Sequence, residues 1–279
     1  MIIDFHVHTF PAEIRTHRDR YFDGEPEFKL LYESPKSKLV SAADIIDMMD
    51  DQEVDMSVVF GFPWRDADTC RRNNDYVIDV VGRYPDRLRG LCCVDSLHPQ
   101  AADEVARCLD AGLSGVGELA FYSCGIDGQC QSSLDPIMTL CRERDAFVLL
   151  HTNEEVGHLY PGKTPNTMIQ IYETVSRFPD NTIILAHWGG GIFFYQLLKK
   201  AVKEVLENVY YDTAASPFLY DSRVYRYAKD LVGIDKVLLG TDYPLLKPSR
   251  YLKEMIDGGL DAADRRAVCG DNAARLLKL

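Results

Sequence analysis

The first apolar run of the chain, Met1-Ile-Ile-Asp-Phe-His-Val-His8, closes with two histidines that are separated by one residue. If residues 2–8 form a β-strand, His6 and His8 lie on the same side of it, because strand side chains alternate with period two. Two imidazoles on one face, at the carboxyl end of a buried strand, make half of a metal site. The other half is to be sought at the ends of the other strands.

Short apolar runs alternate with amphipathic segments along the chain. Several runs are almost entirely apolar, such as residues 57–60 and 183–186, which is typical of strands buried on both faces of a parallel sheet. The predicted strands are 2–8, 55–60, 88–94, 115–119, 146–151, 182–187, 209–212 and 236–240. Helical patterns cover residues 44–52, 99–111, 165–178, 193–206 and 220–231, and Ser41-Ala-Ala-Asp44 resembles a capping box that opens the first of them.

Eight strands alternating with about eight helices predict an α/β fold, a (β/α)8 TIM barrel, as a single domain over residues 1–279. The rival is a doubly wound open sheet, which carries a glycine-rich phosphate loop where this chain has His-Val-His. Residues 9–40 are too long for an ordinary connection and too apolar for a solvated linker. They predict a lid insertion over the carboxyl-terminal mouth of the barrel.

Composition excludes several classes of function. The formal net charge of −12 disfavours a nucleic-acid partner, and no apolar window is long enough to cross a membrane. The N-terminus lacks the basic and apolar pattern of a secretion signal, so a cytoplasmic protein is expected. The eight cysteines contain no C-x-x-C spacing, which predicts reduced, mostly buried thiols that form neither disulfides nor a metal site. The expected partner is a small molecule, and a homodimer is left open.

Polar residues stand at the carboxyl ends of most of the predicted strands, where a barrel collects its active site. They are His6, His8, Glu118, His151, His187, Asp212 and, just after the eighth strand, Asp242. Each alone has an ordinary structural explanation, such as a buried hydrogen bond or a turn. Together, imidazoles and carboxylates at one mouth suit zinc, manganese, iron or nickel. Crowding them without a cation would cost roughly several kcal/mol in desolvation and repulsion.

Four motifs together resemble the amidohydrolase superfamily: Asp4-Phe-His-Val-His8, His151, His187-Trp-Gly-Gly-Gly191 and Gly240-Thr-Asp-Tyr-Pro244. The closest resemblance is to its amidohydrolase-related branch (amidohydrolase 2), which holds metal-dependent hydrolases and non-oxidative decarboxylases. The similarity covers nearly the whole chain, in order. It implies that His6, His8 and Asp242 bind a divalent metal, with zinc as the expected ion and manganese, iron or nickel as alternatives.

The resemblance implies further roles at the same site. His151 would be another ligand, and His187 would sit beside the metal-bound water or bind a second metal. One residue departs from the pattern, since binuclear members often carry a carboxylated lysine where this chain has Glu118. A glutamate there could bridge two metals or orient a ligand, so one or two ions per chain both stay open. Asp4 and Asp212 could orient ligands or make structural hydrogen bonds.

The expected activity is hydrolysis of an amide, ester or lactone bond in a small aromatic or carboxylate-bearing substrate. A metal-activated water would attack, with Asp242 as base and His187 as the group that stabilises the oxyanion or moves protons. The alternative is non-oxidative decarboxylation of a small aromatic or unsaturated acid, which would use the same ligands. A non-catalytic metal-binding barrel is the third hypothesis. Candidate substrate-binding residues near the mouth are Trp64, Arg65, Phe121, Tyr122, Glu154, His158, Lys163 and Trp188.

Overall fold

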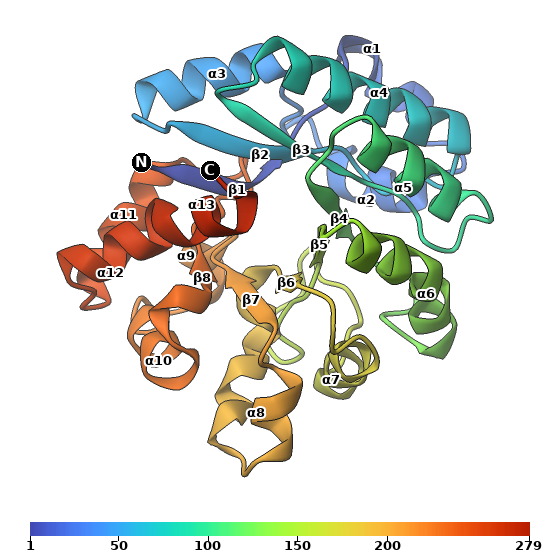
Figure 1. Cartoon of the computed structure of the whole chain (residues 1–279). Coiled ribbons are helices and arrows are strands. Elements are labelled where there is room, and N and C mark those ends of the chain that lie inside the picture. The colour runs from blue at the N-terminus through green and yellow to red at the C-terminus, as the bar shows by residue number, and fades with distance from the viewer.

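A computed structural model describes residues 1–279 as eight parallel strands in sequential order, surrounded by helices. Figure 1 shows the chain passing once around the ring, with its two termini side by side. The strands are β1 (Ile3–His8), β2 (Met56–Phe60), β3 (Leu88–Cys92), β4 (Gly115–Leu119), β5 (Phe147–Leu150), β6 (Ile183–Leu185), β7 (Val209–Asp212) and β8 (Val237–Leu238). All eight strand predictions are confirmed, as is the barrel.

The ring closes through the segment that follows β8. The backbone N–H of Phe5 donates to the carbonyl of Leu239 at 2.7 Å, and the N–H of Asp242 donates to the carbonyl of His6 at 2.9 Å. These bonds bring residues 6 and 242, at opposite ends of the chain, to the same mouth of the barrel.

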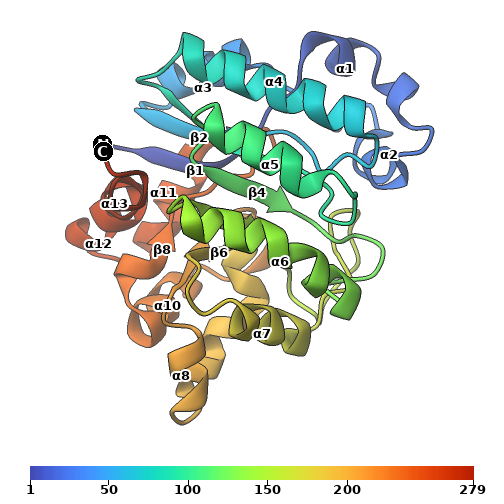
Figure 2. The same cartoon turned by 45° about the vertical axis from the view of Figure 1, so that its right-hand side comes forward.

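The helices lie outside the strands, and Figure 2 shows α4, α5 and α6 following one another along one side. They are α3 (Ala42–Asp51), α4 (Ala67–Arg83), α5 (Ala101–Asp110), α6 (Gly128–Glu143), α7 (Met168–Arg177), α8 (Ala201–Val205), α9 (Ser216–Leu219), α10 (Val224–Val232), α11 (Pro248–Asp257), α12 (Ala262–Arg266) and α13 (Asn272–Leu277). The 3-10 and π segments among these helices are η2 (His187–Leu197), η3 (Ile234–Lys236) and η4 (Ala267–Asp271). The predicted capping box is confirmed, because the side chains of Ser41 and Asp44 each accept from the other's backbone N–H.

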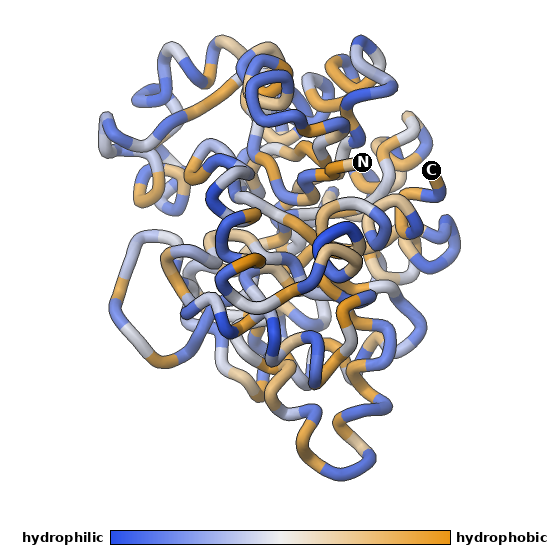
Figure 3. Tube along the Cα trace, turned by 90° about the vertical axis from the view of Figure 1, so that its left-hand side faces the viewer, coloured by the Kyte–Doolittle hydropathy of each residue, from blue (hydrophilic) through white to orange (hydrophobic).

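Two apolar clusters form the core. A cluster of 12 buried residues, drawn mostly from the strands and including Phe5, Leu149 and Leu238, fills the barrel, and a cluster of 56 packs the strands against the helices. The strand register shifts between Asp4 and Val7, so Phe5 joins the inner cluster while Val7 joins the outer one. Apolar and polar residues alternate along the trace in Figure 3, and no helix is long and apolar enough to cross a membrane.

The insertion between β1 and α3 is folded rather than extended. It contains α1 (Ala12–Thr16), η1 (Arg18–Tyr21) and α2 (Pro26–Tyr32). The buried ring of Phe28 lies 4.4 Å from Trp64 and 5.5 Å from Phe62, centroid to centroid. The insertion therefore docks on the connection between β2 and α4. Its action as a lid stays a prediction.

Phe28 gives a direct test of this docking. Phe28→Ala is expected to lower the free energy of unfolding by about 3–5 kcal/mol, because it leaves a cavity among aromatic rings. Equilibrium chemical denaturation measures the change. The matched control is Leu30→Ala on the same helix, whose side chain is exposed, with an expected change within about 0.5 kcal/mol. Equal small changes in both variants would show that the insertion unfolds independently of the barrel.

One helix prediction is wrong. Residues 193–206 are not a single helix, because the chain passes through η2 and begins again at α8. All five residues 187–191 have positive φ angles, a backbone that no α-helix uses. Gly190 is required there, since a Cβ would lie 2.2 Å from the backbone oxygen of Asn153. The turn places His187 at the mouth directly after β6.

Candidate metal centre

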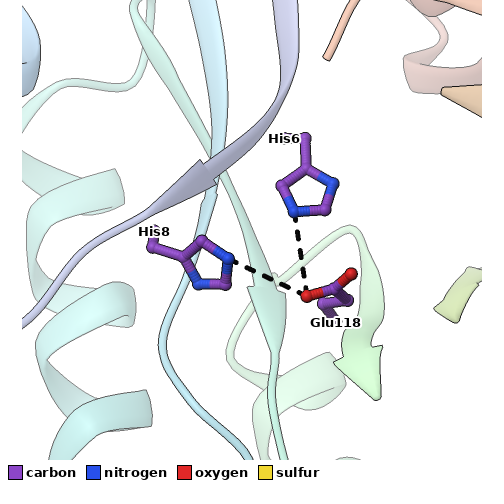
Figure 4. A group of neighbouring side chains, drawn as sticks. All are labelled: His6, His8 and Glu118. Carbon is purple, nitrogen blue, oxygen red and sulfur yellow. Dashed lines mark ion pairs between the residues drawn. The ribbon is translucent and has the colours of Figure 1, made fainter. Parts of the chain in front are cut away.

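Glu118 lies at the centre of four imidazoles. Its Oε2 atom is 3.8 Å from Nε2 of His6 and 3.8 Å from Nε2 of His8, as Figure 4 shows. Its Oε1 atom is 2.9 Å from Nδ1 of His151 and 3.5 Å from Nε2 of His187. Each carboxylate oxygen therefore faces a different pair of histidines, one pair from β1 and one pair from the ends of β5 and β6.

Asp242 approaches the same centre from the segment after β8. Its Oδ1 atom is 3.4 Å from Nε2 of His8 and 3.9 Å from Nε2 of His6. The preceding Thr241 donates its N–H and its hydroxyl to the carboxylate of Asp4, at 3.0 and 2.5 Å. Asp4 thus anchors the segment that presents Asp242, in keeping with an orienting role.

In each of the four histidines, the ring nitrogen that points away from the centre contacts an oxygen acceptor. The pairs are His6 Nδ1 with Asp212 Oδ2 (2.8 Å), His8 Nδ1 with the Gly61 carbonyl (3.2 Å), His187 Nδ1 with the Ala214 carbonyl (2.9 Å) and His151 Nε2 with the Gly162 carbonyl (3.0 Å). A carbonyl or carboxylate oxygen only accepts, so the proton of each neutral ring of His6, His8 and His187 sits on that nitrogen. The other nitrogen of these three rings is then a lone pair aimed at the centre. Both nitrogens of His151 face acceptors, since its Nδ1 atom also lies 2.9 Å from Oε1 of Glu118, and either can carry the ring proton.

Four imidazole nitrogens and two carboxylates facing one another require protons or a cation between them. Two ligands of one ion, each bound at about 2.0–2.2 Å, lie about 3.0–3.5 Å apart. The nitrogen–oxygen separations around Glu118 and Asp242 are 2.9–3.9 Å. The Nε2 atom of His6 is buried and has no hydrogen-bond partner. This donor set, with its outer hydrogen bonds, fits a divalent metal ion.

The electrostatics agree with a site built for positive charge. Burial opposes the charged form of His6, yet Asp212, Glu118 and Asp242 outweigh it and raise the pKa of its imidazole to about 10. Burial likewise opposes ionisation of Glu118, but the adjacent His151 and His6 hold the pKa of its carboxyl well below its usual range. The pKa of Asp242 is also lowered, since His8 and His6 overcome the effect of burial.

Asp212 orients two parts of the centre at once. It is fully buried, and its Oδ1 atom accepts from the backbone N–H groups of His187 and Ala214, at 2.9 and 3.0 Å. Its Oδ2 atom accepts from the ring of His6. The position of Asp212 at the end of β7 was the only sequence signal for this role, and it did not separate orientation from metal binding.

Three of the aromatic residues predicted near the substrate are buried by packing against other side chains. Trp64 and Trp188 are 1% and 0% exposed, and Phe121 is also buried. The indole N–H of Trp64 donates to Asn73, and that of Trp188 donates to Ser216. Their geometry supports packing rather than contact with a ligand. Tyr122 differs, because its ring lies 5.7 Å from that of His151, centroid to centroid.

The two cationic residues predicted to bind the substrate, Arg65 and Lys163, already have partners. Arg65 pairs with Glu27 of the insertion and donates to Ser123, and Lys163 donates to Glu154 at 3.1 Å. Glu154 also accepts from the hydroxyl of Tyr160, while His158 is exposed on the same loop. Neither cation is therefore free for a substrate carboxylate in this structure.

The insertion contributes a residue that the sequence did not single out. The ring of Tyr32 lies 6.3 Å from Phe62, which in turn stacks 6.2 Å from Tyr122 beside the centre. Burial and the negative charges of Asp242 and Glu118 raise the pKa of the Tyr32 phenol. Tyr32 was predicted only as part of an apolar lid, because no spacing relates residue 32 to the strand ends.

The sequence of the chain is similar to those of known decarboxylases. The chain is 26% identical over 263 residues to the 2-amino-3-carboxymuconate-6-semialdehyde decarboxylase of Dictyostelium discoideum, covering 80% of this chain and 70% of that protein. It is 22% identical to the gamma-resorcylate decarboxylase of Polaromonas sp. strain JS666, covering 77% of this chain and 78% of that protein.

Solved structures share the fold. The 5-carboxyvanillate decarboxylase of Novosphingobium aromaticivorans, complexed with manganese and 4-hydroxy-3-methoxy-5-nitrobenzoic acid, superposes with a TM-score of 0.77 at 19% identity. The match covers 100% of this chain and 96% of that one. The sequence model of the amidohydrolase family matches residues 3–279, which is every residue from the start of β1 to Leu279. The resemblance first read from the strand-end motifs is thus confirmed, and the chain belongs to the amidohydrolase family.

Proposed function

We propose that this protein is a metal-dependent non-oxidative decarboxylase of a small aromatic or unsaturated acid. The observation that carries the proposal is the convergence of four imidazole nitrogens and two carboxylates at one mouth of the barrel. Hydrolysis, the main expectation from sequence, would use the same residues. The named relatives are decarboxylases, which favours the alternative over the hydrolase.

We assign His6, His8, His151 and Asp242 as the groups that hold a divalent ion. When bound, that ion would supply the positive charge that binds a substrate carboxylate and a neighbouring oxygen. A protein cation would then be unnecessary for binding the carboxylate, in keeping with the pairing of Arg65 and Lys163 to glutamates. Tyr122 and Tyr32 are proposed to line the space beside the substrate ring.

Decarboxylation requires one proton at the carbon that carries the carboxylate. A new C–H bond forms, the bond to the carboxylate then breaks, its electron pair returns to the substrate and carbon dioxide leaves. Asp242 is proposed to deliver this proton, because its side chain is 21% exposed while those of Glu118, His151 and His187 are 5–7% exposed. His187 is proposed to relay protons to it, since the carboxylate of Glu118 overcomes burial and raises the pKa of His187.

Carbon dioxide release tests the proposed reaction. Protein loaded with manganese, the ion in the structural relative, is incubated with hydroxybenzoates and unsaturated acids that carry a carbon-13 carboxylate. The expected result is labelled carbon dioxide in an amount equal to the decarboxylated product, and its loss after chelation. Cleavage of esters, lactones or amides without carbon dioxide would restore the hydrolase. Inactivity on both panels would favour a binding barrel.

Metal analysis decides the part played by Glu118. Its two carboxylate oxygens face separate histidine pairs. The ligand atoms of each pair lie close enough to those of Glu118 to hold one metal ion. Two ions per chain at saturation would make Glu118 a bridge and His187 a ligand. One ion would leave His187 for proton transfer. Comparing zinc with manganese occupancy in the purified protein identifies the preferred ion.

A further inference from the structure

Two cysteines outside the metal centre lie in contact. The Sγ atoms of Cys124 and Cys130 are 3.1 Å apart, although the sequence spacing of six residues predicted no pairing. A disulfide bond joins sulfurs at about 2.05 Å, so an approach of about 1 Å would close it. Both thiols are free in this structure, as are all eight cysteines.

Access from solvent distinguishes this pair from the other cysteines. Cys124 is partly exposed, whereas the seven other cysteines, Cys130 included, are buried. Thiol–disulfide exchange begins with attack by an accessible sulfur on a small disulfide. Cys124 meets that requirement, and Cys130 stands next to it as the second thiol.

The pair belongs to the loop that borders the metal centre. Cys124 follows Tyr122 by two residues, and Cys130 lies in the first turn of α6. Ser123, which precedes Cys124, donates to Glu27 of the insertion at 2.5 Å. Between the two cysteines, the N–H of Ile126 donates to Asn166 of the connection between β5 and α7. The loop therefore touches both segments that flank the mouth.

We propose that Cys124 and Cys130 are a reversible redox pair that low-molecular-weight disulfides such as oxidised glutathione convert into an intramolecular disulfide, which ties the loop carrying Tyr122 to α6. The sulfur of Cys124 attacks the small disulfide and releases one glutathione thiol, which takes up the proton of Cys124. Cys130 then attacks the mixed disulfide at Cys124 and releases the second glutathione. Two protein thiols are oxidised, and one small disulfide is reduced to two thiols.

The proximity of the pair favours the second step over a lasting adduct. Once Cys124 carries glutathione, attack by Cys130 is intramolecular and has a high effective concentration. A metal site is the other chemistry open to two thiols, and Asp127 lies close enough to join them. However, Asp127 Oδ1 already accepts from the backbone N–H groups of Gln129 and Cys130 as the cap of α6. Without Asp127 the two sulfurs lack a third ligand for a metal ion, which favours the disulfide.

Mass spectrometry of the intact chain tests the chemistry without any activity assay. After treatment with oxidised glutathione, the wild type is expected to lose two hydrogen atoms and to regain them on reduction. Cys130→Ala is expected to keep one glutathione adduct on Cys124, because no second thiol resolves it. Cys124→Ala is expected not to react. The matched control is Cys141→Ala, which removes a buried thiol from the same helix and should behave as the wild type.

Hydrogen exchange tests the constraint on the loop. Amides of residues 120–127 are expected to exchange several-fold more slowly in the oxidised wild type than in the reduced one, with no such difference in Cys124→Ala. A stable glutathione adduct on the wild type, no reaction at all, or thiols protected by a bound metal would overturn the redox pair. Unchanged hydrogen exchange of residues 120–127 in fully oxidised protein would overturn the claim that the disulfide restrains the loop against α6.

Discussion

Asp242→Asn is expected to lower turnover by about 10³-fold or more while the barrel keeps its fold. The change removes the negative charge 3.4 Å from His8 and the group proposed to deliver the proton. Asparagine preserves the shape, and it tolerates the left-handed backbone of this position, whose φ is +58°. The rate is measured as carbon dioxide release at saturating metal, and the fold is checked by thermal unfolding.

The choice of asparagine rather than alanine matters at this position. Alanine would add a strain of about 1–2 kcal/mol at positive φ, so a loss of activity could reflect a displaced loop. The matched control is Asp230→Asn, which removes a charge from the exposed face of α10 and should leave turnover unchanged. If Asp242→Asn kept half of the wild-type activity, the assignment of Asp242 as the catalytic acid–base group would be wrong.

The strands of this fold were predictable because a parallel barrel buries them on both faces. Strands such as Ile183–Leu185 appear in the sequence as continuous apolar runs, whereas the amphipathic helices mix apolar and polar residues. The polar residue that ends each run then falls at one mouth by topology alone. The convergence of His6, His8, His151 and His187 on Glu118 is therefore a consequence of strand order.

The sequence was less informative wherever the partner of a residue comes from a distant loop. Arg65 and Lys163 were predicted to bind the substrate because their carboxylate partners could not be located from spacing. The contact between Cys124 and Cys130 depends on a turn that no periodicity describes. The prediction of a single helix over residues 193–206 failed because the preceding glycines fix an irregular turn that carries into this apolar segment.

The reaction type was undecidable from the site alone. Hydrolysis and decarboxylation both require a divalent ion, a proton-transfer group and a carboxylate or carbonyl held near the ion. Glu118, His187 and Asp242 serve either chemistry. The decarboxylase proposal therefore rests on the named relatives in addition to the geometry, and product analysis is the decisive measurement.

Asp212→Asn is expected to weaken metal binding by about 10–100-fold while the fold is retained. The amide oxygen can take the place of Oδ1 and keep both backbone hydrogen bonds, to His187 and Ala214. The amide NH2 then faces Nδ1 of His6, which must become an acceptor. The ring proton moves to Nε2, the atom that points at Glu118 and Asp242, and a protonated nitrogen cannot bind a cation.

Isothermal titration with manganese measures this effect without reference to turnover. Asp212→Ala is the contrasting variant, since it leaves three buried donors unpaired and is expected to lower the free energy of unfolding by roughly 3 kcal/mol or more. Wild-type metal affinity in a folded Asp212→Asn variant would show that His6 is not a ligand, whatever reaction the protein performs. Weaker binding with unchanged stability would show that one buried carboxylate selects the form of His6 that binds metal.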